Sequence, residues 1–239
     1  MSKSDVGNGM DPPADSNSVT RPGAMRAWLL GGFKVSVGPH TIVGGAWRLR
    51  KAATLVKLLA LARGHRLRRE QVMDLLWPDM DRNAASNNLR RTLHSARRAF
   101  DPSAGYRYLA SQDEQLVLCA RSELWVDVEA FEEATATARR EREPAAYRAA
   151  IELYVGDLLP EDRYEEWAEV RRQELRRMFL SLLVELATVL EERAEPAHVE
   201  DGEFGIGLAT MNPDGSARHH IIHNPGIDKV HHPDWASVR

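Results

Sequence analysis

The sequence predicts two domains, an α+β winged helix-turn-helix followed by an all-α domain of the helical-repeat type. Three observations lead to this prediction: the order of hydrophobic periods along the chain, a reversal of charge between its halves, and one strongly basic amphipathic helix. The 239 residues suffice for two small domains, and the 43% hydrophobic and 28% charged residues are ordinary for a soluble globular protein.

Charge is segregated along the chain, although the formal net charge is only -3. Residues 26–100 contain 15 Lys or Arg residues and four acidic residues, a net of +11. Residues 123–196 contain 10 basic and 19 acidic residues, a net of -9. Such asymmetry indicates a nucleic-acid-binding part joined to a part with another function.

Composition sets the outer boundaries of the two domains. Residues 1–25 are rich in Ser, Asp, Asn, Gly and Pro and offer little to bury, so we expect a disordered leader. Residues 197–239 show no sustained period and are expected to form a poorly ordered tail. Between these segments, the winged helix is predicted over 26–122 and the helical domain over 123–196.

Alternation and helical spacing predict the elements of both domains in order. The first domain is predicted to contain a strand with a Gly-Gly irregularity over 28–37, a strand at 41–43, helices at 47–62, 68–77 and 84–100, and a hairpin with strands at 106–110 and 116–120. This order makes a winged helix-turn-helix, whose third helix enters the DNA major groove. The second domain has helices that begin near Asp127, at Pro144 and near Tyr164. Their alanine-rich character resembles TPR-like scaffolds, without a full internal repeat.

The helix predicted over 84–100 separates into two faces at about 100° per residue. One face carries an apolar stripe of Ala85, Leu89, Leu93, Ala96 and Phe100, and the stretch contains no acidic residue. The opposite face carries the side chains that we expect to read bases, because Arg pairs bidentately with guanine and Asn with adenine: Asn87, Arg91, His94 and Arg98. The alternative is a solvated amphipathic helix that is merely basic.

Cationic side chains around this face are predicted to contact phosphates, with plain solvation as the alternative. Arg90 and Arg97 flank the reading face, which is the side of the helix that carries the four expected base readers. The other candidates begin neighbouring elements or border the hairpin: Lys51, Arg68, Arg69 and Arg107. The predicted hairpin would be the wing of this fold, and its tip carries Asp113 and Glu114, which phosphates would repel. We therefore expect the wing to contact DNA only through Arg107 or Arg121, or not at all.

Two blocks of the sequence, which together span roughly residues 26–196, carry a family resemblance. The N-terminal portion resembles the OmpR-type winged helix of SARP-type bacterial antibiotic regulatory proteins, in the residues Leu30-Gly31-Gly32-Phe33, 63–79, Asn83 to Leu93 and Arg97 to Phe100. The helical portion resembles the bacterial transcriptional activation domain that follows in those proteins, in Val126 to Phe131, Tyr154 to Pro160 and Tyr164 to Trp167.

The resemblance implies a transcriptional activator of secondary-metabolite or pathway genes that binds direct repeats near promoters. It also implies RNA polymerase as a partner and homo-oligomers on DNA. The family's helical domain normally continues through further helices, whereas the pattern here breaks off after Pro196. A second hypothesis is therefore a truncated interaction protein that associates with full-length relatives through its helices.

Several other classes of function are not favoured by the sequence. It contains no P-loop, HExxH motif or nucleophile elbow, so we expect neither an enzyme nor a cofactor. The single cysteine, Cys119, and the absence of a signal peptide or membrane span predict a cytoplasmic protein. Five tail histidines fit no structural zinc pattern, so a metal-sensing regulator is the weakest hypothesis: His219, His220, His223, His231 and His232.

Overall fold

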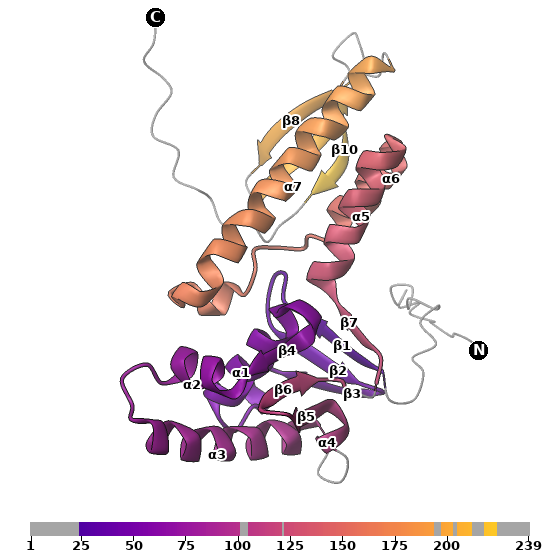
Figure 1. The fold of residues 1–239 in the computed structure, drawn as a ribbon. Coiled ribbons are helices and arrows are strands. Elements are labelled where there is room, and N and C mark those ends of the chain that lie inside the picture. Colours follow the sequence, from indigo (N-terminus) through magenta and orange to yellow (C-terminus); the bar gives the residue numbers. More distant parts are fainter. Residues whose placement is uncertain are drawn as a thin grey trace, which may run out of the picture.

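The computed structural model describes backbone and side chains for residues 24–100, 107–120 and 122–193, and the backbone alone for 105–106, 197–202, 205–211 and 218–223. Two parts are visible in Figure 1: a lower α+β part from the first half of the chain and an upper part built on long helices. None of the helices in these ranges is long and apolar enough to cross a membrane. Most of the predicted leader lies outside the described residues.

A four-stranded sheet forms one side of the first domain, with the order β3-β2-β1-β7. Its strands are β1 (Met25–Trp28), β2 (Lys34–Val37), β3 (His40–Val43) and β7 (Leu124–Val126). The single strand predicted over 28–37 is wrong: β1 and β2 are an antiparallel pair, and Gly31 and Gly32 turn the chain between them at φ 75° and 143°. β7 pairs in parallel with β1, so this sheet extends past the predicted boundary at residue 122.

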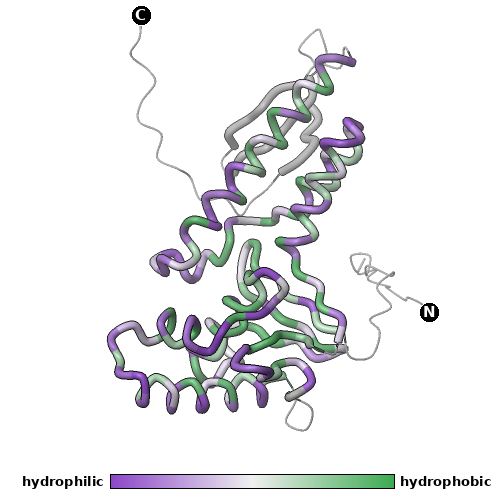
Figure 2. Tube along the Cα trace, viewed as in Figure 1, coloured by the Kyte–Doolittle hydropathy of each residue, from purple (hydrophilic) through white to green (hydrophobic). Residues whose placement is uncertain are grey.

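The three predicted helices are present and share a hydrophobic core with this sheet: α1 (Arg50–Leu61), α2 (Arg69–Leu76) and α3 (Arg82–Phe100). Strand β4 (Arg66–Arg68) leads directly into α2. The apolar stripe of α3 is buried against the same core as the buried face of α1, and Figure 2 shows the hydrophobic segments gathered between the helices and the sheet. Trp47 links these layers, because its ring stacks on Phe33 and meets the edge of Phe100.

The predicted hairpin is present and forms a second sheet, with the order β4-β6-β5. It consists of β5 (Leu109–Gln112) and β6 (Gln115–Leu118), joined by Asp113 and Glu114, both at positive φ, which gives a two-residue turn. The strand predicted to begin at residue 106 is wrong there, because residues 105–108 form the short helix α4 (Gly105–Tyr108). Tyr108 packs its ring near Phe100 at the end of α3.

The second domain is helical, with α5 (Asp127–Glu141), α6 (Pro144–Glu152) and α7 (Glu166–Glu192). A short 3-10 turn, η3 (Pro160–Asp162), precedes α7. Three aromatic rings form the centre of this domain: Tyr154 stacks on Phe179 at 4.5 Å between ring centroids and lies 5.3 Å from Phe131. All three side chains are fully buried, and Tyr147 and Ile151 of α6 are buried in the same core, so each helix contributes to it.

The tail differs from the sequence-based expectation over three stretches. β8 (Ala197–Gly202), β9 (Gly205–Met211) and β10 (Arg218–His223) form an antiparallel sheet in the order β10-β9-β8. Ile206 and Leu208 alternate with small residues, which is the period-two pattern of a strand, and this pattern is too short to show as a sustained period. The rest of the predicted tail lies outside the described residues.

Candidate nucleic-acid interface

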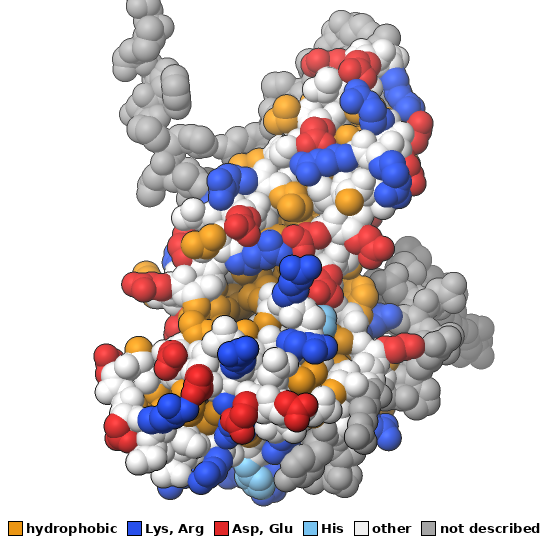
Figure 3. Space-filling model, viewed as in Figure 1, with side chains coloured by type: hydrophobic (Ala, Val, Ile, Leu, Met, Phe, Trp, Pro, Cys, Tyr) orange, Lys and Arg blue, Asp and Glu red, His pale blue; other side chains and the backbone are white. Residues whose placement is uncertain are grey.

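Helix α3 lies at the end of the molecule farthest from the helical domain, with its outer side uncovered by other elements (Figure 1). The four predicted base readers are all exposed: Asn87, Arg91, His94 and Arg98. The opposite stripe is between 0% and 4% exposed, and it fixes the rotation of the helix about its axis. Figure 3 shows basic and histidine side chains along this edge. The helix therefore presents a polar, cationic face to solvent, while its opposite side is held in the core.

Arg90 lies beside the reading face and contacts one of its members. Its Nη1 is 3.4 Å from Oδ1 of Asn87, and both side chains are exposed. The guanidinium can swing to a phosphate at small cost, because an exposed hydrogen bond of this length contributes little. Its predicted role as a phosphate contact stays a prediction.

Arg97 has a structural role that the sequence did not predict. Its Nε donates a hydrogen bond of 2.9 Å to the backbone oxygen of Leu109, and the side chain is half-buried. Because Leu109 begins β5, this bond ties α3 to the hairpin. The signal in the sequence was the position of Arg97, next to the buried Ala96 and at the edge of the apolar stripe.

Arg69 connects the start of α2 to the tip of the hairpin. Its backbone N–H donates to the oxygen of Glu114 at 2.9 Å, its Nη1 donates to Ser111 at 3.3 Å, and its Nε lies 3.8 Å from the Glu114 carboxylate. The guanidinium thus compensates part of the negative charge at the hairpin tip. Arg69 is directed toward the hairpin, which weakens its candidacy as a phosphate contact.

The remaining phosphate candidates are exposed but lie on different elements. Arg68 ends β4, where its backbone N–H donates to the side-chain oxygen of Gln71. The side chain of Arg68 itself is exposed at the surface next to α2. Arg107 lies on α4, at the hairpin end of the domain. Lys51 lies in the first turn of α1, next to Arg50, whose guanidinium pairs with Glu165 of the helical domain. Arg68 and Arg107 are therefore the better-placed candidates, and the phosphate role of all three stays a prediction.

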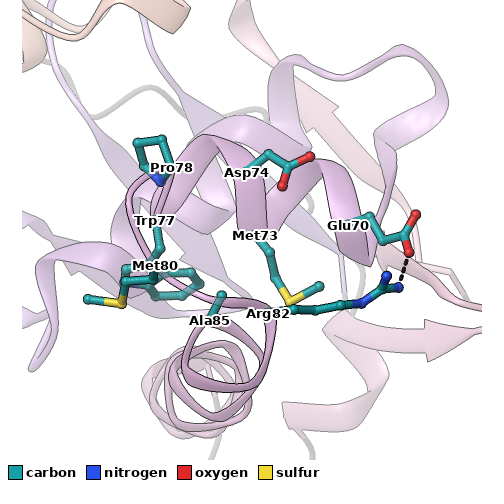
Figure 4. A pocket seen from close by; sticks show the side chains of 8 residues that line it. All are labelled: Glu70, Met73, Asp74, Trp77, Pro78, Met80, Arg82 and Ala85. Carbon is teal, nitrogen blue, oxygen red and sulfur yellow. Dashed lines mark hydrogen bonds and ion pairs between the residues drawn. The ribbon is translucent and has the colours of Figure 1, made fainter.

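A shallow pocket of about 340 Å³ lies between α2 and α3, beside the turn that joins them. Figure 4 shows Met73, Trp77 and Met80 lining it, with Arg82 reaching across to form an ion pair with Glu70. The four acidic residues of the basic segment all fall within 70–81, around this pocket. Helix α3 itself contains no acidic residue, so its outer face carries no negative side chain of its own.

A buried polar junction joins the DNA-binding candidate to the helical domain. Lys57 of α1 is 5% exposed and pairs with Asp162 and, at 3.0 Å, with Glu161, both in η3. Glu161 also accepts the backbone N–H of Phe33 at 3.0 Å. Sequence periodicity could not have paired these residues, because they lie more than 100 positions apart.

Asp127, the first residue of α5, forms the second half of the junction. Its Oδ2 accepts the backbone N–H groups of Leu29 at 2.8 Å and Leu30 at 2.9 Å, and its Oδ1 accepts the N–H of Val128. The carboxylate therefore satisfies backbone donors of the β1–β2 link and of its own helix. With the Lys57 contacts, it fixes the orientation of α5 and η3 on the first domain.

We expect the junction to respond to pH through Asp127. Burial raises the pKa of its carboxyl to about 6, while the backbone N–H groups of Leu30, Leu29 and Val128 act to lower it. Because burial disfavours the charged form, the contribution of the Asp127 side chain to the free energy of unfolding is largest when the carboxyl is protonated. That contribution is complete below about pH 4, near the unfolded pKa, and is lost as pH rises through 6. Chemical denaturation should show the unfolding free energy of wild type falling relative to that of Asp127→Asn, which does not titrate, by on the order of 1–3 kcal/mol as pH rises from 4 to 7. A wild type that gains stability relative to Asp127→Asn over this range would contradict this assignment.

Metal binding finds no support in the described side chains, among which no group of three or more His, Cys, Asp or Glu residues could hold an ion. His219, His220 and His223 fall in β10, whose side chains are not described, and His231 and His232 lie outside the described residues. Cys119 is buried, and burial raises the pKa of its thiol to about 12, so it remains a protonated, apolar side chain.

Comparison with known proteins supports the fold. No family model matches this chain, and no curated protein is similar to it. Among solved structures, Mycobacterium tuberculosis EmbR, in complex with a low-affinity phosphopeptide, matches with a TM-score of 0.57 and 15% sequence identity. The match covers 71% of this chain and 46% of the EmbR chain, so this chain spans less than half of that protein. At this identity the likeness establishes the fold alone, which this chain shares with part of EmbR.

Proposed function

We propose that this protein is a sequence-specific DNA-binding transcriptional regulator whose helix α3 enters the major groove. One observation carries the proposal: an exposed face of amide, imidazole and guanidinium groups stands opposite a fully buried apolar stripe on a 19-residue helix. Asn87, Arg91, His94 and Arg98 would contact base edges, where Arg and Asn have complementary donor and acceptor patterns. The fold shared with EmbR, the sequence resemblance to SARP-type regulators and the net of +11 over residues 26–100 support it.

The proposed partners follow from the same surface and from the resemblance. Promoter DNA with direct repeats is the proposed ligand, bound by more than one copy of the chain. The acidic helical domain would contact protein, with RNA polymerase as the proposed target and activation of pathway genes as the outcome. The buried junction at Lys57 and Asp127 supports a fixed position of that domain relative to the bound DNA.

Selection of binding sites from random duplex DNA by the full chain tests the proposal. We expect a short motif to be enriched, and a repeated half-site at fixed spacing if copies bind side by side. Enrichment that does not rise above the random pool would show that the basic face of α3 is only a solvated surface.

An interaction protein is the second candidate, favoured by apolar residues on the outside of α7. Val170 and Val184 are 68% and 62% exposed and lie within about 40° of each other around the helix. This reading requires association with a longer relative through the helical domain. Size-exclusion chromatography and pull-down with such a relative separate the two, because a DNA-reading regulator binds its site without one.

A further inference from the structure

Helix α3 begins earlier than its hydrophobic stripe, at Arg82, and Asp81 fixes this start. The Oδ1 of Asp81 accepts the N–H of Asn83 at 2.9 Å and of Ala84 at 3.0 Å, while its backbone oxygen accepts the N–H of Ala85 at 2.9 Å. A side-chain oxygen that accepts from the second and third helical residues is an N-cap. Asn83 is therefore a first-turn residue of the helix, with a fixed side-chain direction.

The early start places Asn83 on the face that carries the predicted base readers. At about 100° per residue, Asn83 lies about 40° from Asn87 around the helix axis, on the same side as His94. Its side chain is exposed. The polar sector thus extends one turn toward the helix N-terminus, which is the part of a recognition helix that contacts base edges.

The carboxamide of Asn83 is available for a ligand. Its side chain forms no hydrogen bond with any described residue, and only its backbone N–H is used, by Asp81. By comparison, Asn87 is in contact with Arg90, and Nδ2 of Asn88 donates to Met80. A carboxamide offers one acceptor and two donors, the pattern that pairs bidentately with N7 and N6 of adenine.

We infer that Asn83 is a specificity-determining residue that reads an adenine at the end of the binding site, beside the base pair reached by Asn87. Side chains four residues apart on a helix are about 5–6 Å apart at Cβ, and successive bases rise about 3.4 Å, so the two amides reach neighbouring base pairs. This inference rests on the proposed function, because it names a base read by the same helix face.

Site selection with the full chain and three variants tests the role of Asn83. Asn83→Ala removes the amide, and Asn83→Asp keeps its shape but lacks the amino donor, while an acidic side chain in the first turn favours the helix. Asn88→Ala is the matched control, because Asn88 is the same residue type on the same helix but lies about 100° from Asn87, off the reading face. We expect wild type and Asn88→Ala to select the same motif, and both Asn83 variants to lose the adenine at one end.

Affinity measurements give the size of the effect. Replacing that adenine should weaken wild-type binding by about 5- to 150-fold, whereas the Asn83→Ala protein should bind the two duplexes equally. If wild type selects no motif, the proposed function fails. If wild type selects a motif and Asn83→Ala retains the adenine, the inference about Asn83 is overturned and the proposed function stands. A uniform loss of affinity with an unchanged motif also overturns it, because that is the signature of a phosphate contact.

Discussion

Arg91→Ala and Arg98→Ala are each expected to lose discrimination at one base pair of the selected site, and the double variant at both. Each bidentate Arg–guanine contact contributes about 1–3 kcal/mol of discrimination, so the double variant should lose about 2–6 kcal/mol of preference for its site. Both side chains are exposed on the helix face opposite the buried stripe, so their removal leaves the core unchanged. Titration of each variant against the selected duplex and single-position substitutions measures these losses.

Arg140→Ala is the control for the charge removed by these substitutions. Arg140 is 70% exposed on α5 in the helical domain, so its removal lowers the net charge equally but should leave discrimination unchanged. Loss of affinity by Arg91→Ala that is the same for every duplex would contradict base reading and would assign Arg91 to the phosphates instead.

Lys57→Met is expected to destabilise the protein by about 3–5 kcal/mol, because it leaves the carboxylate of Asp162 buried without its main cation. The side chains of Lys57 and Asp162 are each 6% exposed, so water cannot replace the lost partner. Methionine retains an apolar side chain of similar length, so the substitution removes mainly the ammonium group, which also lies 4.7 Å from the centre of the Phe33 ring. The midpoint of chemical denaturation of the full chain measures the loss.

Two further variants separate burial from charge pairing. Glu192→Gln breaks the exposed Arg142–Glu192 pair on the surface of the helical domain and should cost only about 0–1 kcal/mol. The double variant Lys57→Met/Asp162→Leu should recover most of the stability, because apolar residues often replace a buried ion pair without loss. If Lys57→Met were no more destabilising than Glu192→Gln, the buried junction would not be what holds the two domains together.

The sequence predicted the buried and exposed faces of α3 well because a helical stripe depends only on local spacing. Ala85, Leu89 and Phe100 are buried where the period of 3.6 places them, and Arg91 is exposed opposite. The start of the helix was placed two residues late, because the capping role of Asp81 is a matter of side-chain geometry rather than of hydrophobic period. That error concealed the position of Asn83.

Contacts between distant segments could not be predicted from periodicity. β7 pairs with β1 although almost 100 residues separate them, and residues 106–108 form a helix where their aromatic residues favoured a strand, since packing against the end of α3 overrides that preference. Likewise, the partners of Lys57 and Arg97 are known only once the fold brings η3 and β5 beside them.

The most direct test of DNA reading by α3 is a titration of the full chain at about 150 mM salt against its selected duplex and a scrambled duplex of the same composition. Salt near the physiological value weakens non-specific phosphate contacts, so that base contacts dominate the difference between the two. We predict that the selected duplex binds about 10³-fold tighter or more, as is typical of specific regulators. Equal affinity for the two duplexes would contradict sequence reading by Asn87, Arg91, His94 and Arg98.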